Sequence, residues 1–171
     1  YPSRTTDRDR KERRGKSKRR YILSGRRDRK ANVTAVPPER AFGDFEGRSF
    51  AQIEQEMPEQ AQLWRTRVPD WIPPGGGESL LAMQQRVMTT VNALAQQHLG
   101  QQIAVVAHGG VLDLLYRAAT QQSLQAPRSW TLGNAAINRL LWTPQGLSLV
   151  GWGDVSHFDE ALGAPRDETT T

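Results

Sequence analysis

A histidine followed by two glycines is the first candidate for chemistry in this chain. The apolar run Ile103–Ala107 precedes His108-Gly109-Gly110, and the segment Val111–Thr120 follows with further apolar positions. A continuous apolar run predicts a fully buried strand, and the segment beyond the glycines predicts a helix. Glycines let backbone amides approach a ligand, and a helix N-terminus favours an anion. The pattern therefore predicts an anion site at His108, although a tight strand-to-helix turn without a ligand has the same features.

A second candidate is a loop that combines carboxylates with glycines. Its sequence is Glu39-Arg40-Ala41-Phe42-Gly43-Asp44-Phe45-Glu46-Gly47. A carboxyl group in this loop could act as a general acid if burial or a neighbouring anion raises its pKa. A solvated acidic loop has the same composition, and the residues of this segment alone favour that simpler interpretation.

A third candidate is the glycine-rich segment Gly75-Gly76-Gly77-Glu78-Ser79. A glycine-rich loop ahead of a helix can cradle phosphate with its backbone amides. No Lys-Ser/Thr pair follows the glycines, so the segment does not fit the P-loop pattern. A role of Glu78 or Ser79 in capping the next helix explains the segment equally well.

Two helices are expected ahead of the His108 turn, and they would position the loops around it. Ser49 is a suitable N-cap for a helix from Phe50 to about Met57, which Pro58 ends or interrupts. A longer helix is predicted over residues 79–98, because its apolar positions recur mostly at helical spacing. The acidic loop and the glycine-rich segment each precede one of these helices.

Beyond His108 the pattern predicts one helix and then two strands. The predicted buried side of the helix consists of Leu112, Leu115, Ala118 and Ala119. The strands are expected over Ala136–Trp142 and Leu147–Trp152, with a hairpin turn at Thr143-Pro144-Gln145-Gly146.

Taken together, the three candidate segments resemble the histidine phosphatase superfamily, which includes phosphoglycerate mutase and small phosphomonoesterases. Members look like Glu-Arg-x-Phe-Gly-x-Trp/Phe-Glu-Gly, then Gly-Glu-Ser at the start of a long helix, then a strand that ends in His-Gly-Gly. All three occur here in order, over about Val33 to Phe158. The resemblance implies an α/β fold with three layers and a mostly parallel sheet flanked by helices, incomplete at its N-terminal side.

The resemblance also implies roles for individual residues. His108 would hold the transferring phosphoryl group, and Glu39 would donate a proton to the oxygen of the leaving alcohol. The amide of Gly109 would bind phosphate, while Arg40 and the region Ser49–Arg67 would face the substrate. The implied reaction is phosphoryl transfer or hydrolysis of a small phosphate monoester through a phosphohistidine, with a phosphatase preferred over a mutase. It implies no metal and no cofactor.

Two family motifs are missing from this sequence. Members begin with a strand ending in Arg-His-Gly, whose histidine is the nucleophile, and a later Ser-Asp-Leu-x-Arg-Ala-type segment supplies an arginine. All three histidines here follow residue 97, and Ser24-Gly25-Arg26-Arg27 is too loose a match for the second motif. Covalent catalysis needs its nucleophile. We therefore expect little or no turnover from this chain.

The charge of the chain is divided unevenly. Residues 1–30 hold 14 Lys/Arg and 4 Asp/Glu (+10), whereas residues 31–171 hold 9 Lys/Arg and 14 Asp/Glu (−5). All four lysines lie in the first part. Residues 1–31 are expected to be a disordered tail, a nucleic-acid-binding arm or a segment that is not native, such as a translation out of frame. Residues 32–160 would form the domain, and residues 161–171 a flexible tail.

Composition excludes several other classes of protein. The chain has no cysteine, which excludes disulfides and thiolate zinc sites. It also has no apolar run long enough to span a membrane, so a cytoplasmic protein without a membrane partner is expected. The expected partner is a small phosphorylated substrate, and the oligomeric state stays open. Two alternatives remain, a non-catalytic binder of phosphate esters and a nucleic-acid-binding protein that uses the basic arm.

Overall fold

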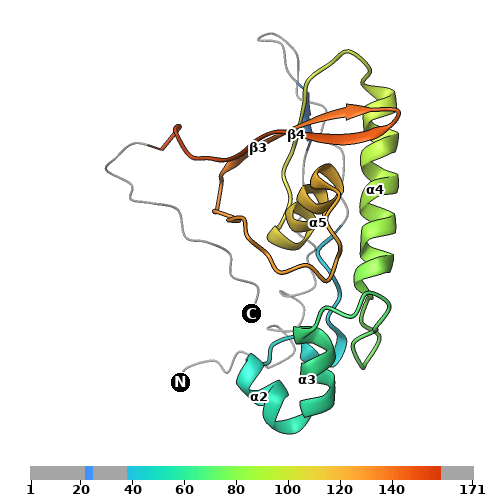
Figure 1. Cartoon of the computed structure of the whole chain (residues 1–171), viewed down its shortest axis with the longest axis vertical. Coiled ribbons are helices and arrows are strands. Elements are labelled where there is room, and N and C mark those ends of the chain that lie inside the picture. The colour runs from blue at the N-terminus through green and yellow to red at the C-terminus, as the bar shows by residue number, and fades with distance from the viewer. Residues whose placement is uncertain (1–21, 25–37, 159–171) are drawn as a thin grey trace, which may run out of the picture. The chain divides into compact units, whose positions relative to one another are not determined.

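The computed structural model describes residues 22–24 and 38–158 (Figure 1). It divides into two units, one of residues 1–36 with 101–106 and one of residues 37–100 with 107–171. Apart from residues 22–24, the predictions for the basic segment 1–31 lie outside the described residues, as does the predicted tail 161–171.

The first unit contains a two-stranded antiparallel sheet. Strand β1 (Ile22–Ser24) pairs with β2 (Ile103–Val105), with Ile22 opposite Val105. The prediction of a fully buried strand at Ile103–Ala107 is wrong for β2, because Ala104 is exposed and its two neighbours are only half-buried. A two-stranded sheet has no interior strand, so neither member gains the burial that a central parallel strand has.

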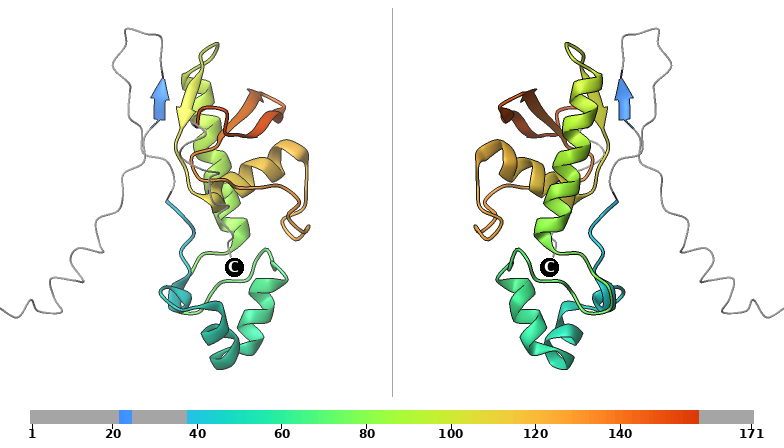
Figure 2. Two further views of the ribbon diagram at one scale, coloured as in Figure 1. Left: turned by 90° about the vertical axis from the view of Figure 1, so that its left-hand side faces the viewer. Right: turned by 90° about the vertical axis from the view of Figure 1, so that its right-hand side faces the viewer.

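The second unit is built around two helices and a hairpin (Figures 1 and 2). Helix α4 (Leu80–Gln97) packs against α5 (Gly109–Thr120), and α5 in turn contacts the strand β4 (Gly146–Asp154). The buried core of these elements consists of Leu80, Met83, Val87, Val111, Leu114, Leu115 and Leu124. This core fixes the N-terminal end of α5, where the His108 turn lies.

The predicted buried side of α5 was partly wrong. Leu115 is buried as expected, whereas the other predicted positions, Leu112, Ala118 and Ala119, are only half-buried. The buried residues include Val111 and Leu114, together with the charged residues Asp113 and Arg117. The apolar pattern missed the true face because two of its positions carry charges that pair with each other, one helical turn apart.

A separate aromatic core lies around the short helices. The helices are η1 (Gly43–Phe45), α2 (Phe50–Glu56) and α3 (Pro58–Arg65), so the predicted helix after Ser49 and its interruption at Pro58 are confirmed. Ser49 forms a capping box with Gln52. The core consists of Phe45, Ile53 and Ala61, with Phe42, Phe50, Met57, Trp64 and Trp71 packed against it.

The predicted hairpin is confirmed within two residues at its ends. Strand β3 (Ile137–Thr143) pairs antiparallel with β4, and the pairing closes at Thr143 opposite Gly146. Both sheets among the described residues are therefore two-stranded and antiparallel. The mixture of helices and strands agrees with the predicted α/β class. No helix among the described residues is long and apolar enough to cross a membrane.

Ser79 starts α4 as predicted, and its side chain offers a direct test of that cap. Its hydroxyl oxygen accepts a hydrogen bond from the Ala82 amide at 3.1 Å. Replacing Ser79 with alanine is expected to lower the free energy of unfolding by about 1 kcal/mol, because the Ala82 amide loses its acceptor. Urea denaturation followed by circular dichroism checks it. The exposed Ser129→Ala serves as control, and equal stabilities of the two variants would contradict the prediction.

Candidate functional site

His108 lies at the N-cap of α5, with an extended backbone (φ −88°, ψ 167°) that ends the preceding chain and opens the helix. Its carbonyl oxygen accepts the first helical hydrogen bond, from the Leu112 amide at 3.0 Å. Its side chain makes no capping bond and keeps 41% of its surface exposed. The imidazole is therefore available to a ligand at the positive end of the helix.

The structure brings Glu39 next to this imidazole. Glu39 Oε2 lies 4.0 Å from His108 Nδ1, although the two residues are 69 positions apart in the sequence. Glu39 Oε1 lies directly over Gly110, and a Cβ atom at that glycine would overlap with the carboxylate oxygen. Gly110 is thus required for the approach of Glu39, because any side chain there would push the carboxylate away.

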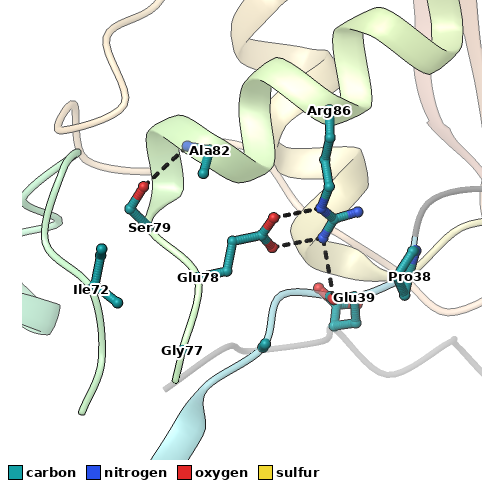
Figure 3. A pocket seen from close by; sticks show the side chains of 9 residues that line it. Pro38, Glu39, Ile72, Gly77, Glu78, Ser79, Ala82 and Arg86 are labelled. Carbon is teal, nitrogen blue, oxygen red and sulfur yellow. Dashed lines mark hydrogen bonds and ion pairs between the residues drawn. The ribbon is translucent and has the colours of Figure 1, made fainter. Parts of the chain in front are cut away.

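The backbone of Glu39 is held by Arg86 of α4, which pairs with Glu78 just ahead of that helix (Figure 3). The Arg86 guanidinium donates to both carboxylate oxygens of Glu78, from Nε at 2.6 Å and from a terminal nitrogen at 2.7 Å. The same terminal nitrogen donates to the Glu39 carbonyl oxygen at 3.3 Å. Arg86 therefore ties the start of α4 to the segment that carries Glu39. Sequence reasoning missed Arg86, whose only signal was an arginine on the helix that Glu78 opens.

Arg40 is buried rather than exposed to a substrate in this structure. Only 7% of its surface is exposed, its Nε donates to the Glu78 carbonyl oxygen at 2.7 Å, and its guanidinium lies against the rings of Phe42 and Trp71. Burial, with a smaller contribution from the charge of Arg67, lowers the pKa of Arg40 to about 10. Through these contacts Arg40 stabilises the loop that contains it. Its predicted role in substrate binding stays a prediction.

The glycine-rich segment packs against the acidic loop. The Asp44 amide donates to the Pro74 carbonyl oxygen at 2.8 Å, and a Cβ atom at Gly43 would overlap with that same oxygen. A Cβ atom at Gly75 would likewise overlap with the Asp44 carboxylate. Gly43 and Gly75 both have positive φ, which glycine adopts without strain. The glycines thus serve the close approach of two loops, which favours the structural interpretation of this segment over a phosphate cradle.

An open hollow of about 370 Å³ lies beside Glu39 and Glu78 (Figure 3). Its lining is mostly apolar and consists of Pro38, Glu39, Ala41, Ile72, Gly77, Glu78, Ser79, Ala82 and Arg86. His108 is not among the residues that line this hollow.

Gly109 and the other two histidines lie in the following positions. Gly109 is buried in the first turn of α5. His98 is the C-cap of α4, where the sequence had placed it, and His157 packs against the ring of Phe158.

A second charged cluster was not expected from the sequence. Asp113 Oδ2 accepts hydrogen bonds from Arg67 at 2.8 Å and from Arg117 at 2.9 Å. Arg117 is fully buried, and it also donates to the backbone of the loop after α5, at the carbonyl oxygens of Ser123 and Ala126. This cluster ties the end of α3 to α5 and thereby holds the helix whose N-terminus carries His108.

Comparisons with known proteins agree with the motifs. A family model described as "Histidine phosphatase superfamily (branch 1)" matches residues 21–155, so the match begins ten residues ahead of the boundary expected near residue 31. The chain is 32% identical to "Phosphoglycerate mutase-like protein 4" and 33% identical to "Metal-independent phosphoserine phosphatase", both of Arabidopsis thaliana. These alignments cover 71% and 74% of this chain.

A third relative is "Adenosylcobalamin/alpha-ribazole phosphatase" of Escherichia coli (strain K12), 37% identical over 56% of this chain and 46% of the relative. Each of the two Arabidopsis alignments covers 52% of the relative. The chain thus spans about half the length of the curated relatives it matches. No solved structure matches the chain.

Proposed function

Since this chain belongs to the histidine phosphatase superfamily, we propose that it carries the phosphate-holding and proton-donating half of a phosphoryl-transfer site for small phosphate monoesters. His108 and the amide of Gly109 would hold the phosphoryl oxygens at the N-terminus of α5, where a dianion is favoured. Glu39 would protonate the oxygen of the leaving alcohol as its bond to phosphorus breaks. The observation that carries this proposal is the 4.0 Å approach of the Glu39 carboxylate to His108.

The half of the site that attacks phosphorus is not part of this proposal. A phosphohistidine mechanism needs a second histidine as nucleophile, and residues 1–97 of the printed sequence contain none. Hydrolysis is preferred over a mutase reaction, which is supported by two similar proteins that are named as phosphatases. We further propose that residues 32–160 adopt the three-layer fold of the family. Its sheet would be mostly parallel and incomplete at its N-terminal side.

A turnover assay tests the half-site directly. With p-nitrophenyl phosphate, the chain is expected to release nitrophenolate no faster than buffer, because residues 1–97 contain no histidine to act as the nucleophile. Adding free imidazole as a substitute nucleophile is expected to restore turnover that depends on His108. The measurement is absorbance of nitrophenolate, with His108→Ala and His157→Ala as a matched pair. If the chain hydrolysed the substrate rapidly without imidazole, and His108→Ala abolished this activity, the proposal of a half-site would be contradicted.

Further measurements separate the two alternatives from the proposed function. A non-catalytic binder of phosphate esters would be stabilised by phosphate against heat but would gain no turnover from imidazole. A nucleic-acid-binding protein would bind RNA or DNA with a steep dependence on salt, and removal of residues 1–30 would abolish that binding. Neither alternative requires the Glu39 carboxylate to lie beside His108.

A further inference from the structure

Three contacts hold the segment that carries Glu39 against the start of α4. The Arg40 side chain donates to the Glu78 carbonyl oxygen at 2.7 Å, and the Glu78 amide donates to the Ala41 carbonyl oxygen at 2.8 Å. The third contact is the bond from Arg86 to the Glu39 carbonyl oxygen at 3.3 Å, which is the only one of the three that acts on Glu39 itself. Of these three contacts, the Arg86 bond therefore bears most directly on the position of Glu39.

Arg86 is rigid enough to act as a support. Its guanidinium is a planar fork, and Glu78 occupies two of its nitrogens with bonds of 2.6 and 2.7 Å. Both side chains are mostly buried, with 28% and 19% of their surfaces exposed. A pair that is held at two points and shielded from water keeps one geometry, in contrast to an exposed ion pair.

The Glu39 carboxylate is confined from the other side by α5. Its Oε1 atom rests over Gly110, and the Met83 side chain lies close to the same point. The Arg86 bond thus holds the backbone of Glu39, and the close approach to α5 limits where its carboxylate can lie. A proton donor that is already positioned loses less conformational entropy when a substrate binds.

We propose that Arg86, clamped by Glu78, is a positioning residue that sets the Glu39 carboxylate beside His108. This inference rests on the proposed function, in which Glu39 is the proton donor. Arg86 acts through the Glu39 backbone and does not touch the phosphoryl group. Its conservative replacement by lysine should keep part of this effect, whereas an apolar residue should lose it.

The test reads the His108 ring directly and needs no turnover. The chain has only three histidines, so their ring signals in a proton–carbon NMR spectrum can be assigned by single replacements. At one fixed pH, Glu39→Gln is expected to shift the His108 signals and leave those of His98 and His157 in place. Arg86→Met is expected to reproduce at least half of that shift. Gly110→Ala, which displaces the same carboxylate by steric overlap, should shift them as well.

Controls separate positioning from a general loss of structure. Arg139→Met removes a different arginine–carboxylate pair, the exposed one with Asp154, and is expected to leave the His108 signals unchanged. Arg86→Lys should return the signals part of the way to those of the unaltered chain. If Arg86→Met does not fold, Arg86→Gln keeps a donor for Glu78 but is too short to serve Glu39, and it takes the place of the methionine variant.

A double replacement completes the experiment. Because Arg86 is proposed to act only through Glu39, adding Arg86→Met to Glu39→Gln should shift the His108 signals little further. His108 signals that respond to Glu39→Gln but not to Arg86→Met would overturn the positioning role while leaving the proposed function intact. Signals that respond to neither variant would overturn both, because the carboxylate would then not lie beside the imidazole in solution.

Discussion

Replacing Asp113 with alanine is expected to lower the free energy of unfolding by about 3–5 kcal/mol, because it leaves the buried Arg117 and the partly buried Arg67 without their counterion. Asp113 is the only carboxylate that pairs with Arg67 or Arg117 among the described residues. Arg117 has no exposed surface, and one of its terminal nitrogens already lacks a partner. Burial lowers the pKa of Arg67, and the charge of Asp113 counteracts part of that effect.

The measurement for Asp113→Ala is urea denaturation followed by circular dichroism. Asp113→Asn keeps the shape and one acceptor oxygen, so it is expected to lose less stability than the alanine variant. Asp70→Ala removes an exposed carboxylate and should change stability by no more than about 0.5 kcal/mol. A loss below about 1 kcal/mol for Asp113→Ala would mean that water reaches these arginines and that the cluster does not hold α5.

Replacing His108 with alanine is expected to weaken the binding of inorganic phosphate about 10- to 100-fold. A hydrogen bond to a charged group contributes about 1.5–3 kcal/mol, and each 1.4 kcal/mol corresponds to a factor of ten. The α5 N-terminus and the Gly109 amide remain in this variant, so binding should be weakened rather than abolished. Isothermal titration calorimetry of the purified chain with phosphate gives the two dissociation constants.

Two other histidines supply matched controls for this measurement. His98→Ala and His157→Ala are expected to leave the phosphate affinity unchanged, since His98 ends α4 and His157 packs against Phe158. Equal affinities of the unaltered chain and His108→Ala would place the anion elsewhere. Raising the salt concentration should weaken the binding moderately, because a partly exposed anion site is screened.

Local elements of this protein were predictable because their signals lie within a few residues. Ser49 and Ser79 were expected to cap helices, and each hydroxyl accepts a bond from the amide three residues on. Such a cap needs only the chain that follows it. The hairpin turn after Thr143 was predictable for the same reason, since Pro and Gly restrict or free the backbone at single positions.

Burial was less predictable, because it depends on partners far away in the sequence. Arg40 and Arg117 look like surface residues, yet both are buried because carbonyl oxygens, aromatic rings and a carboxylate surround their guanidinium groups. Arg67, which pairs with Asp113 from the turn just after α3, lies 46 positions away. A pattern of apolar spacing counts such residues as exposed, and the buried face of α5 was misassigned as a result. For β2 the same pattern predicted burial that the two-stranded sheet does not provide.

The sequence by itself pointed to the residues that could do chemistry here, since the His108 turn predicts an anion site and the Glu39 loop stands ahead of it in the order that resembles the family. Only the tertiary structure decided that they meet, with Glu39 Oε2 at 4.0 Å from the imidazole. That distance is set by Gly110, which leaves room for the carboxylate, and by Arg86, which holds the Glu39 carbonyl oxygen. Neither contact could be predicted from the spacing of residues, because tertiary packing brings together segments that are dozens of residues apart in the sequence.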